Sequence, residues 1–105
     1  MTVHDIGAAS DFVDGKPTRV EVAGHLVSVV RLGDDLYAIG DTCTHADVSL
    51  SEGEVDADER TLECWKHGSA FSLETGEPCS LPAVRPVPVY DVRTADDRVL
   101  LEVSG

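Results

Sequence analysis

The sequence has few cysteines, few cationic side chains and no long apolar run, and each shortage excludes a class of protein. Three cysteines in 105 residues do not suggest the disulfide framework of a small secreted domain. Eight Lys and Arg against twenty Asp and Glu give a net charge of −12, which argues against binding to nucleic acid or to an anionic membrane. The most apolar run, Leu26 to Val30, is far too short to span a bilayer.

The remaining bulk properties are those of one globular domain. A chain of this length buries roughly two thirds of its unfolded surface, so it does not need disulfides to fold. The acidic charge favours solubility and also steering toward a basic protein partner, and charge alone does not decide between these roles. Residues 1–15 contain neither a basic segment nor the apolar core of a signal peptide, so we expect a cytoplasmic protein.

Short apolar runs separated by turn residues predict an all-β fold, a small sandwich or barrel. Ala23-Gly24 is placed to form a turn, and Gly33-Asp34-Asp35 and Ala95-Asp96-Asp97 are placed to form hairpin turns. The segment from Ala8 to Asp14 predicts a single helical turn. The predicted strands are Thr18–Val22, His25–Leu32, Leu36–Ile39, Val87–Arg93 and Val99–Val103.

The middle of the chain differs from these β-rich ends. Residues 41–86 hold all three cysteines and two of the four histidines, and they end in a stretch whose prolines disfavour helix and central strand. We expect a single domain over residues 1–105, with a β base formed by residues 1–40 and 87–105 and a loop-rich lobe at 41–86. The acidic run Glu52–Glu63 in this lobe is either a docking face or a solvated loop, and we favour the loop.

Two short motifs in the lobe each combine a thiol with an imidazole. Cys43-x-His45 is followed, after eighteen residues, by Cys64-x-x-His67. Two thiolates and two imidazoles can hold a four-coordinate metal group, and a mononuclear zinc site is one possibility. Common zinc modules, however, pair Cys with Cys and His with His. One residue of each kind in both motifs favours a two-iron cluster, with both cysteines on one iron and both histidines on the other.

The sequences CTH and CWKHG resemble the paired cluster-binding motifs of Rieske proteins. The following Phe71, the Thr75-Gly76 turn and the proline-rich stretch before VPVYDV are similar to the Rieske-type ferredoxin components of aromatic-ring-hydroxylating dioxygenase systems. The resemblance covers essentially the whole chain. It implies an antiparallel β-sandwich or barrel base with a smaller cluster-binding lobe, and one [2Fe-2S] cluster per chain held by Cys43, His45, Cys64 and His67. A third loop, Ser80 to Pro86, would cover the cluster and includes Pro82.

The resemblance also implies a function. Such a ferredoxin carries one electron at a time from a reductase, flavin-containing or of another kind, to a terminal non-haem iron oxygenase, and catalyses no substrate chemistry. The chain cannot itself be that oxygenase, because only His4 and His25 remain for a catalytic iron and there is no room for a substrate domain. Three alternatives stay open: a Rieske-like subunit for nitrite reduction, an accessory protein for iron–sulfur maintenance, and a structural zinc module.

Neighbouring residues set the expected potential. Neutral imidazoles in place of two thiolates make reduction easier, so Rieske centres lie at about −150 to +300 mV against about −400 mV for plant-type ferredoxins. High-potential respiratory relatives carry a disulfide where this chain has Val48 and Lys66, and a tyrosine where it has Phe71. Only Ser69 remains as a hydrogen-bond donor toward the cluster. We therefore expect a potential in the lower group.

Other residues receive more modest predictions. Trp65 and Phe71 are expected to shield the cluster from water, and Lys66 and Arg85 to influence partner recognition. Cys79 has no place in the ligand pattern and is expected to be a free thiol.

Overall fold

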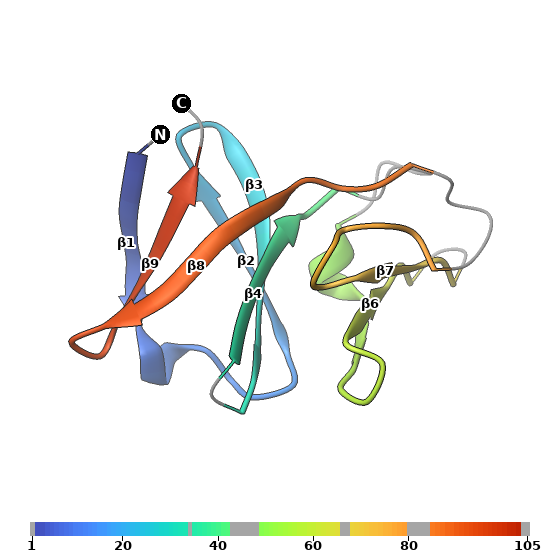
Figure 1. Cartoon of the computed structure of the whole chain (residues 1–105), viewed down its shortest axis with the longest axis horizontal. Helices are drawn as coiled ribbons and strands as arrows, with labels where there is room; N and C mark the ends of the chain where they lie inside the picture. Colours follow the sequence, from blue (N-terminus) through green and yellow to red (C-terminus); the bar gives the residue numbers. More distant parts are fainter. Residues whose placement is uncertain (1, 34, 43–48, 66–67, 80–84, 104–105) are drawn as a thin grey trace.

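The computed structural model describes residues 2–33, 35–42, 49–65, 68–79 and 85–103, which form antiparallel sheets and contain no α-helix (Figure 1). Two 3-10 turns, η1 (Ala9–Asp11) and η2 (Leu50–Glu52), complete the elements. A three-stranded sheet consists of β5 (Glu54–Asp56), β6 (Thr61–Glu63) and β7 (Ala70–Ser72). A six-stranded sheet has the order β1 (Thr2–Ala8), β9 (Arg98–Val103), β8 (Val89–Ala95), β4 (Asp35–Gly40), β3 (His25–Leu32) and β2 (Pro17–Val22).

Every predicted strand is present, and β3 has the predicted bounds. The single turn predicted within Ala8 to Asp14 is η1. Two features were not predicted. The first is β1, whose pairing with β9 shifts register between Asp5 and Gly7. The second is the three-stranded sheet, in which β5 and β6 run through the acidic segment Glu52–Glu63 where a solvated loop was expected, and β7 follows them.

Two of the predicted turns are two-residue turns with positive φ angles. Ala95, predicted to begin the second, is the last residue of β8. Ala23 and Gly24 have φ values of 50° and 83°, and Asp96 and Asp97 have values of 51° and 63°. Two successive residues with positive φ characterise the type I′ turn, whose twist matches that of the strands it joins. Asp tolerates this conformation better than most residues do, which explains the use of two aspartates between β8 and β9.

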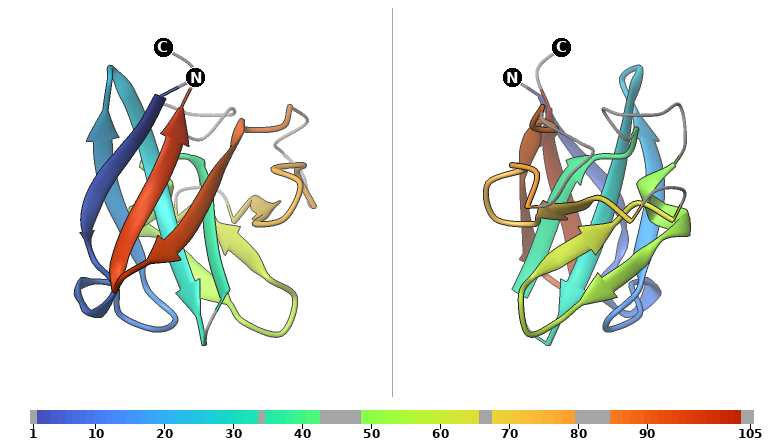
Figure 2. Two further views of the ribbon diagram at one scale, coloured as in Figure 1. Left: turned by 60° about the vertical axis from the view of Figure 1, so that its left-hand side comes forward. Right: turned by 90° about the vertical axis from the view of Figure 1, so that its right-hand side faces the viewer.

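The six-stranded sheet curls around an apolar interior, which we call the base core (Figure 2). Side chains of β3 alternate between two environments because successive residues of a strand point to opposite faces. Val27 and Val29 lie in the base core, whereas Val30 and Leu32 lie on the other face. The buried base-core residues are Phe12, Val22, Val27, Val29, Ala38, Val99, Leu101 and Val103.

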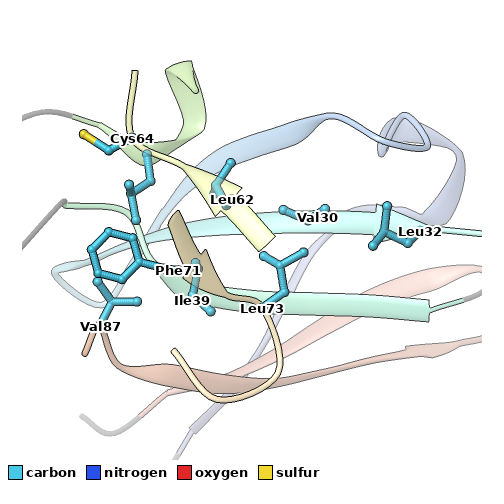
Figure 3. Packing of buried hydrophobic residues seen from close by; sticks show 9 residues of the cluster. Val30, Leu32, Ile39, Leu62, Cys64, Phe71, Leu73 and Val87 are labelled. Atoms are coloured by element: carbon cyan, nitrogen blue, oxygen red, sulfur yellow. The ribbon is translucent and has the colours of Figure 1, made fainter. Parts of the chain in front are cut away.

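A second apolar cluster, the lobe core, fills the space between the outer face of β3 and β4 and the three-stranded sheet (Figure 3). Val55, Leu62 and Phe71 are in register across β5, β6 and β7, so that they share one face of this small sheet. Leu62 and Phe71 are fully buried. The buried lobe-core residues are Val30, Leu32, Ile39, Leu50, Leu62, Cys64, Phe71, Leu73 and Val87.

The opposite face of the three-stranded sheet is polar, because Glu54 lies directly opposite Glu63 and Asp56 opposite Thr61. The sequence division at residues 41 and 86 stays a prediction. In the part of the chain that the structure describes, no helix is long and apolar enough to cross a membrane.

Candidate metal centre

Cys64 lies at the end of β6, directly after the strand that places Leu62 in the lobe core. Its side chain is completely buried and forms no disulfide. Figure 3 shows its sulfur at the margin of the lobe core, directed away from Leu62. A buried, unpaired thiol is a soft donor, which suits an iron–sulfur cluster.

Backbone hydrogen bonds close a turn after Cys64. The Cys64 N–H donates to the Ser69 carbonyl at 2.6 Å, and the Gly68 N–H donates to the Cys64 carbonyl at 3.0 Å. Gly68 has φ of +74°, which side-chain-bearing residues rarely adopt. This turn brackets Lys66 and His67, which lie outside the described residues.

The predicted neighbours of the cluster occupy two kinds of environment. Ser69 and Phe71 are fully buried, Phe71 within the lobe core. Trp65 is 54% exposed, so at most part of its ring can cover a cluster. Pro82, in the predicted third loop, lies outside the described residues. The roles assigned to these residues remain predictions.

The first motif can be located only through its flanks, because Cys43 and His45 also lie outside the described residues. Thr42 and Ser49 form an isolated antiparallel bridge, and the Leu50 N–H donates to the Asp41 carbonyl at 2.6 Å. The residues that flank segment 43–48, Thr42 and Ser49, are therefore held side by side.

A buried carboxylate reinforces this junction. The Asp41 side chain is 2% exposed and lies 3.3 Å from Nε of Arg19. The hydroxyl groups of Ser28 and Ser49 donate hydrogen bonds to it at 2.5 and 2.6 Å, and the Ser51 N–H donates at 3.1 Å. We call these five residues the Asp41 network.

Electrostatics favour the ionised form of this carboxylate. Burial by itself would raise the pKa of Asp41, but the hydrogen bonds from Ser28, Ser49 and Ser51 outweigh burial and hold the pKa below its usual value. Sequence reasoning missed Asp41, because one Asp in a polar loop is unremarkable. Its position two residues before Cys43, with serines at 49 and 51, was the available signal.

The other described cysteine and histidines lie elsewhere. Cys79 is an exposed free thiol, as expected. His4 hydrogen-bonds the Thr2 hydroxyl at 2.9 Å, and His25 contacts the Tyr90 ring edge-on at 5.7 Å between ring centres. Among residues that the structure describes, no three His, Cys, Asp or Glu side chains are grouped so as to hold a metal ion. Of the four predicted ligands, the structure therefore describes Cys64, and the assignment of the other three stays a prediction.

Comparison with known proteins decides the family. The Rieske [2Fe-2S] domain family matches residues 2–91. The chain belongs to the Rieske family. It is 44% identical to Ferredoxin CarAc of Metapseudomonas resinovorans over 93 residues, which is 88% of this chain and 85% of the relative. Family membership confirms the predicted Rieske fold and implies one [2Fe-2S] cluster, which the soft donors of the two motifs fit.

Solved Rieske structures agree closely. The ferredoxin of carbazole 1,9a-dioxygenase from Nocardioides aromaticivorans IC177 is 37% identical with a TM-score of 0.93, over 96% of this chain and 97% of that one. A ferredoxin chain in a complex of reduced oxygenase and oxidized ferredoxin of carbazole 1,9a-dioxygenase is 41% identical with a TM-score of 0.86, over 94% and 91% of the two chains. A putative nitrite reductase small subunit from Mycobacterium tuberculosis is less similar, at 26% identity and a TM-score of 0.87 over 99% and 97% of the chains.

Proposed function

We propose that this Rieske protein is the ferredoxin of a multicomponent oxygenase system and carries single electrons to a terminal oxygenase. The observation that carries the proposal is 41% identity, over nearly the whole chain, to a ferredoxin bound to its oxygenase. The ferredoxin relatives are electron-transfer components, so the protein is not itself the catalyst. By the same reasoning a reductase supplies the electrons, and we place the exchange in the cytoplasm.

Four residues would hold the cluster: Cys43 and Cys64 on one iron, and His45 and His67 on the other. When bound, the cluster accepts and releases one electron at a potential that the imidazole ligands raise above that of a four-cysteine cluster. Burial of Cys64 and the apolar lobe core behind it would keep water from the sulfur side. The turn closed at Ser69 would fix the spacing of Cys64 and His67.

The exposed side of Trp65 adjoins a groove that is suited to a partner protein. Trp65 and the side chain of Arg19 are each more than half exposed, so the surface is neither wholly apolar nor wholly acidic. Aromatic and arginine side chains are enriched among residues that contribute most to binding. The lining residues are Arg19, Leu26, Asp41, Thr42, Ser49, Glu52 and Trp65.

The proposal is tested by spectroscopy followed by electron transfer. Protein purified without oxygen should be red-brown, contain two irons per chain, and give a rhombic EPR signal of low average g after dithionite reduction. Its potential should lie in the lower Rieske group. It should also support turnover when combined with a reductase and an aromatic-ring oxygenase. A colourless protein with one bound zinc would instead establish the structural-zinc alternative.

The nitrite-reduction alternative has weaker support, because the ferredoxin relatives are more similar in sequence than the nitrite reductase small subunit. Failure to accept electrons from any oxygenase reductase, combined with electron exchange in a nitrite-reducing system, would favour that alternative.

A further inference from the structure

We propose that Asp41 is a positioning residue for the cluster: its buried carboxylate joins the two ends of segment 43–48 and thereby sets the placement of Cys43 and His45. The inference rests on the proposed ligand set. Asp41 belongs to neither motif. Among the described residues, it contacts no side chain of a predicted ligand.

The carboxylate connects three separate parts of the chain. Ser28 lies on β3, on the same face of that strand as Val30, and so projects toward the lobe. Asp41 directly follows β4 and precedes segment 43–48, whereas Ser49 and Ser51 follow that segment. Hydrogen bonds from all three serines therefore tie the residues on both sides of the segment to strand β3 of the base.

All the contacts to the carboxylate oxygens are donors, as an ionised carboxylate requires. They include two hydroxyl groups, one backbone N–H and one guanidinium. The hydroxyl groups of Ser49 and Ser51 also lie 2.6 Å apart, which extends the network by one hydrogen bond. No buried side-chain N or O atom in the described part of the chain lacks a partner.

A buried carboxylate with several donors is better suited to fixing the position of the chain around it than to raising the stability of the fold. A buried charge is costly to desolvate, and apolar residues of similar volume often stabilise a site as well or better. What apolar residues cannot do is select one geometry for two chain ends by directional hydrogen bonds. A loop whose flanking residues are already joined has fewer conformations. It therefore loses less conformational entropy when it binds a metal group.

The test compares the holoprotein with Asp41→Asn, which keeps the shape but loses the charge and turns an acceptor into a donor. The measurements are the rate of iron release to a chelator, the EPR spectrum after reduction, and the Tm. We expect Asp41→Asn to release iron about tenfold faster or more, given the strength of hydrogen bonds to charged groups. We also expect its g values to shift.

Two control variants separate positioning from general loss of stability. Asp91→Asn removes the same charge from an exposed position on β8, and Val99→Ala destabilises the base core. Both should keep the wild-type EPR spectrum, and Val99→Ala should release iron more slowly than Asp41→Asn although its Tm also falls. Equal iron release by Asp41→Asn and Asp91→Asn would overturn the proposal, as would equal release by Asp41→Asn and Val99→Ala at matched Tm.

Milder variants decide the question if Asp41→Asn does not fold. Ser28→Ala and Ser49→Ala each remove one donor and keep the charge, and Ser10→Ala is the exposed control. We expect iron release to rise several-fold in the first two and to stay unchanged in Ser10→Ala, and identical rates in all three would overturn the proposal. Failure of the proposed function is recognised separately, because the wild-type protein would then fail to support oxygenase turnover or, as a zinc protein, would lack the histidine-ligated EPR signal.

Discussion

The base and the lobe achieve order by different means. The base has long strands of six to eight residues around an apolar interior, and most neighbouring strands pair over five residues or more. The lobe has strands of three residues, too short to be stable without the apolar contacts beneath them and the hydrogen bonds at their ends. The fold of the base therefore follows from the alternation of apolar and polar residues along its strands. The stability of the lobe depends instead on a few specific contacts and on its metal group.

The largest effect should come from removing a ligand from the lobe. We expect Cys64→Ser to abolish the cluster and to lower the Tm, because a group that binds only the native state stabilises it. Iron content, visible absorption and thermal melting measure both effects. Cys79→Ser is the matched control, since that thiol is exposed, and it should retain two irons per chain. Loss of iron from Cys79→Ser would contradict the ligand assignment.

A matched pair of leucines then compares the two cores. Leu62 in the lobe and Leu101 in the base are both fully buried. Each substitution by Ala should lower the free energy of unfolding by about 3 kcal/mol, from lost apolar burial plus a cavity. Chemical denaturation measures this loss. Only Leu62→Ala should also speed iron release, so equal release from both variants would show that the cores do not act separately.

A pair of glycines tests how tightly the lobe is assembled. A Cβ at Gly53 would lie 1.7 Å from the Glu63 carbonyl oxygen, whereas one at Gly24 would meet nothing within 4 Å. Gly53→Ala forces β5 away from β6 and should cost about 2 kcal/mol, as overpacking commonly does. Gly24→Ala should cost less, because its φ of +83° strains an alanine but its Cβ meets no other atom. Denaturation midpoints rank the two variants, and the reverse order would be inconsistent with the structure.

The smallest effect concerns the edge of the base. Hydrogen bonds from Arg98 to the exposed Asp5 hold the pKa of that carboxyl below its ordinary value. Because the folded pKa is the lower one, this contribution is present above about pH 4, the unfolded value, and is lost as the pH falls through the folded value. Asp5→Asn should therefore lower the Tm slightly at pH 7 and weaken its fall in acid. An unchanged acid profile would show that the pair contributes nothing.

The sequence was informative where periodicity extends over several residues. Valine-rich alternation predicted β3, and turn residues predicted the hairpin at Asp96-Asp97. It was uninformative for β5 and β6, because three residues cannot establish a period and their acidic side chains suggested a loop. Strand β1 was missed because its residues are mixed and its register is broken near Gly7.

The site divides in the same way. Cysteine and histidine spacing predicted a ligand set, since few metal groups require one of each in two short motifs. The Asp41 network could not be predicted, because Ser28 and Asp41 are thirteen residues apart and meet only when β3 and β4 pair. The spacing of residues within a short motif can therefore predict which residues are ligands. The residues that hold those ligands in place come together only in the tertiary structure.

One feature of the fold has a consequence for the motions of the protein. Strand β3 contributes to both cores and pairs with β2 on one side and β4 on the other. Opening of the lobe uncovers Val30 and Leu32 but leaves Val27 and Val29 covered and the strand hydrogen bonds intact. We therefore expect the amide protons of β3 to exchange with solvent more slowly than those of β5 to β7, which can exchange through local opening of the lobe. The lobe can thus open locally while the base sheet beneath it stays folded.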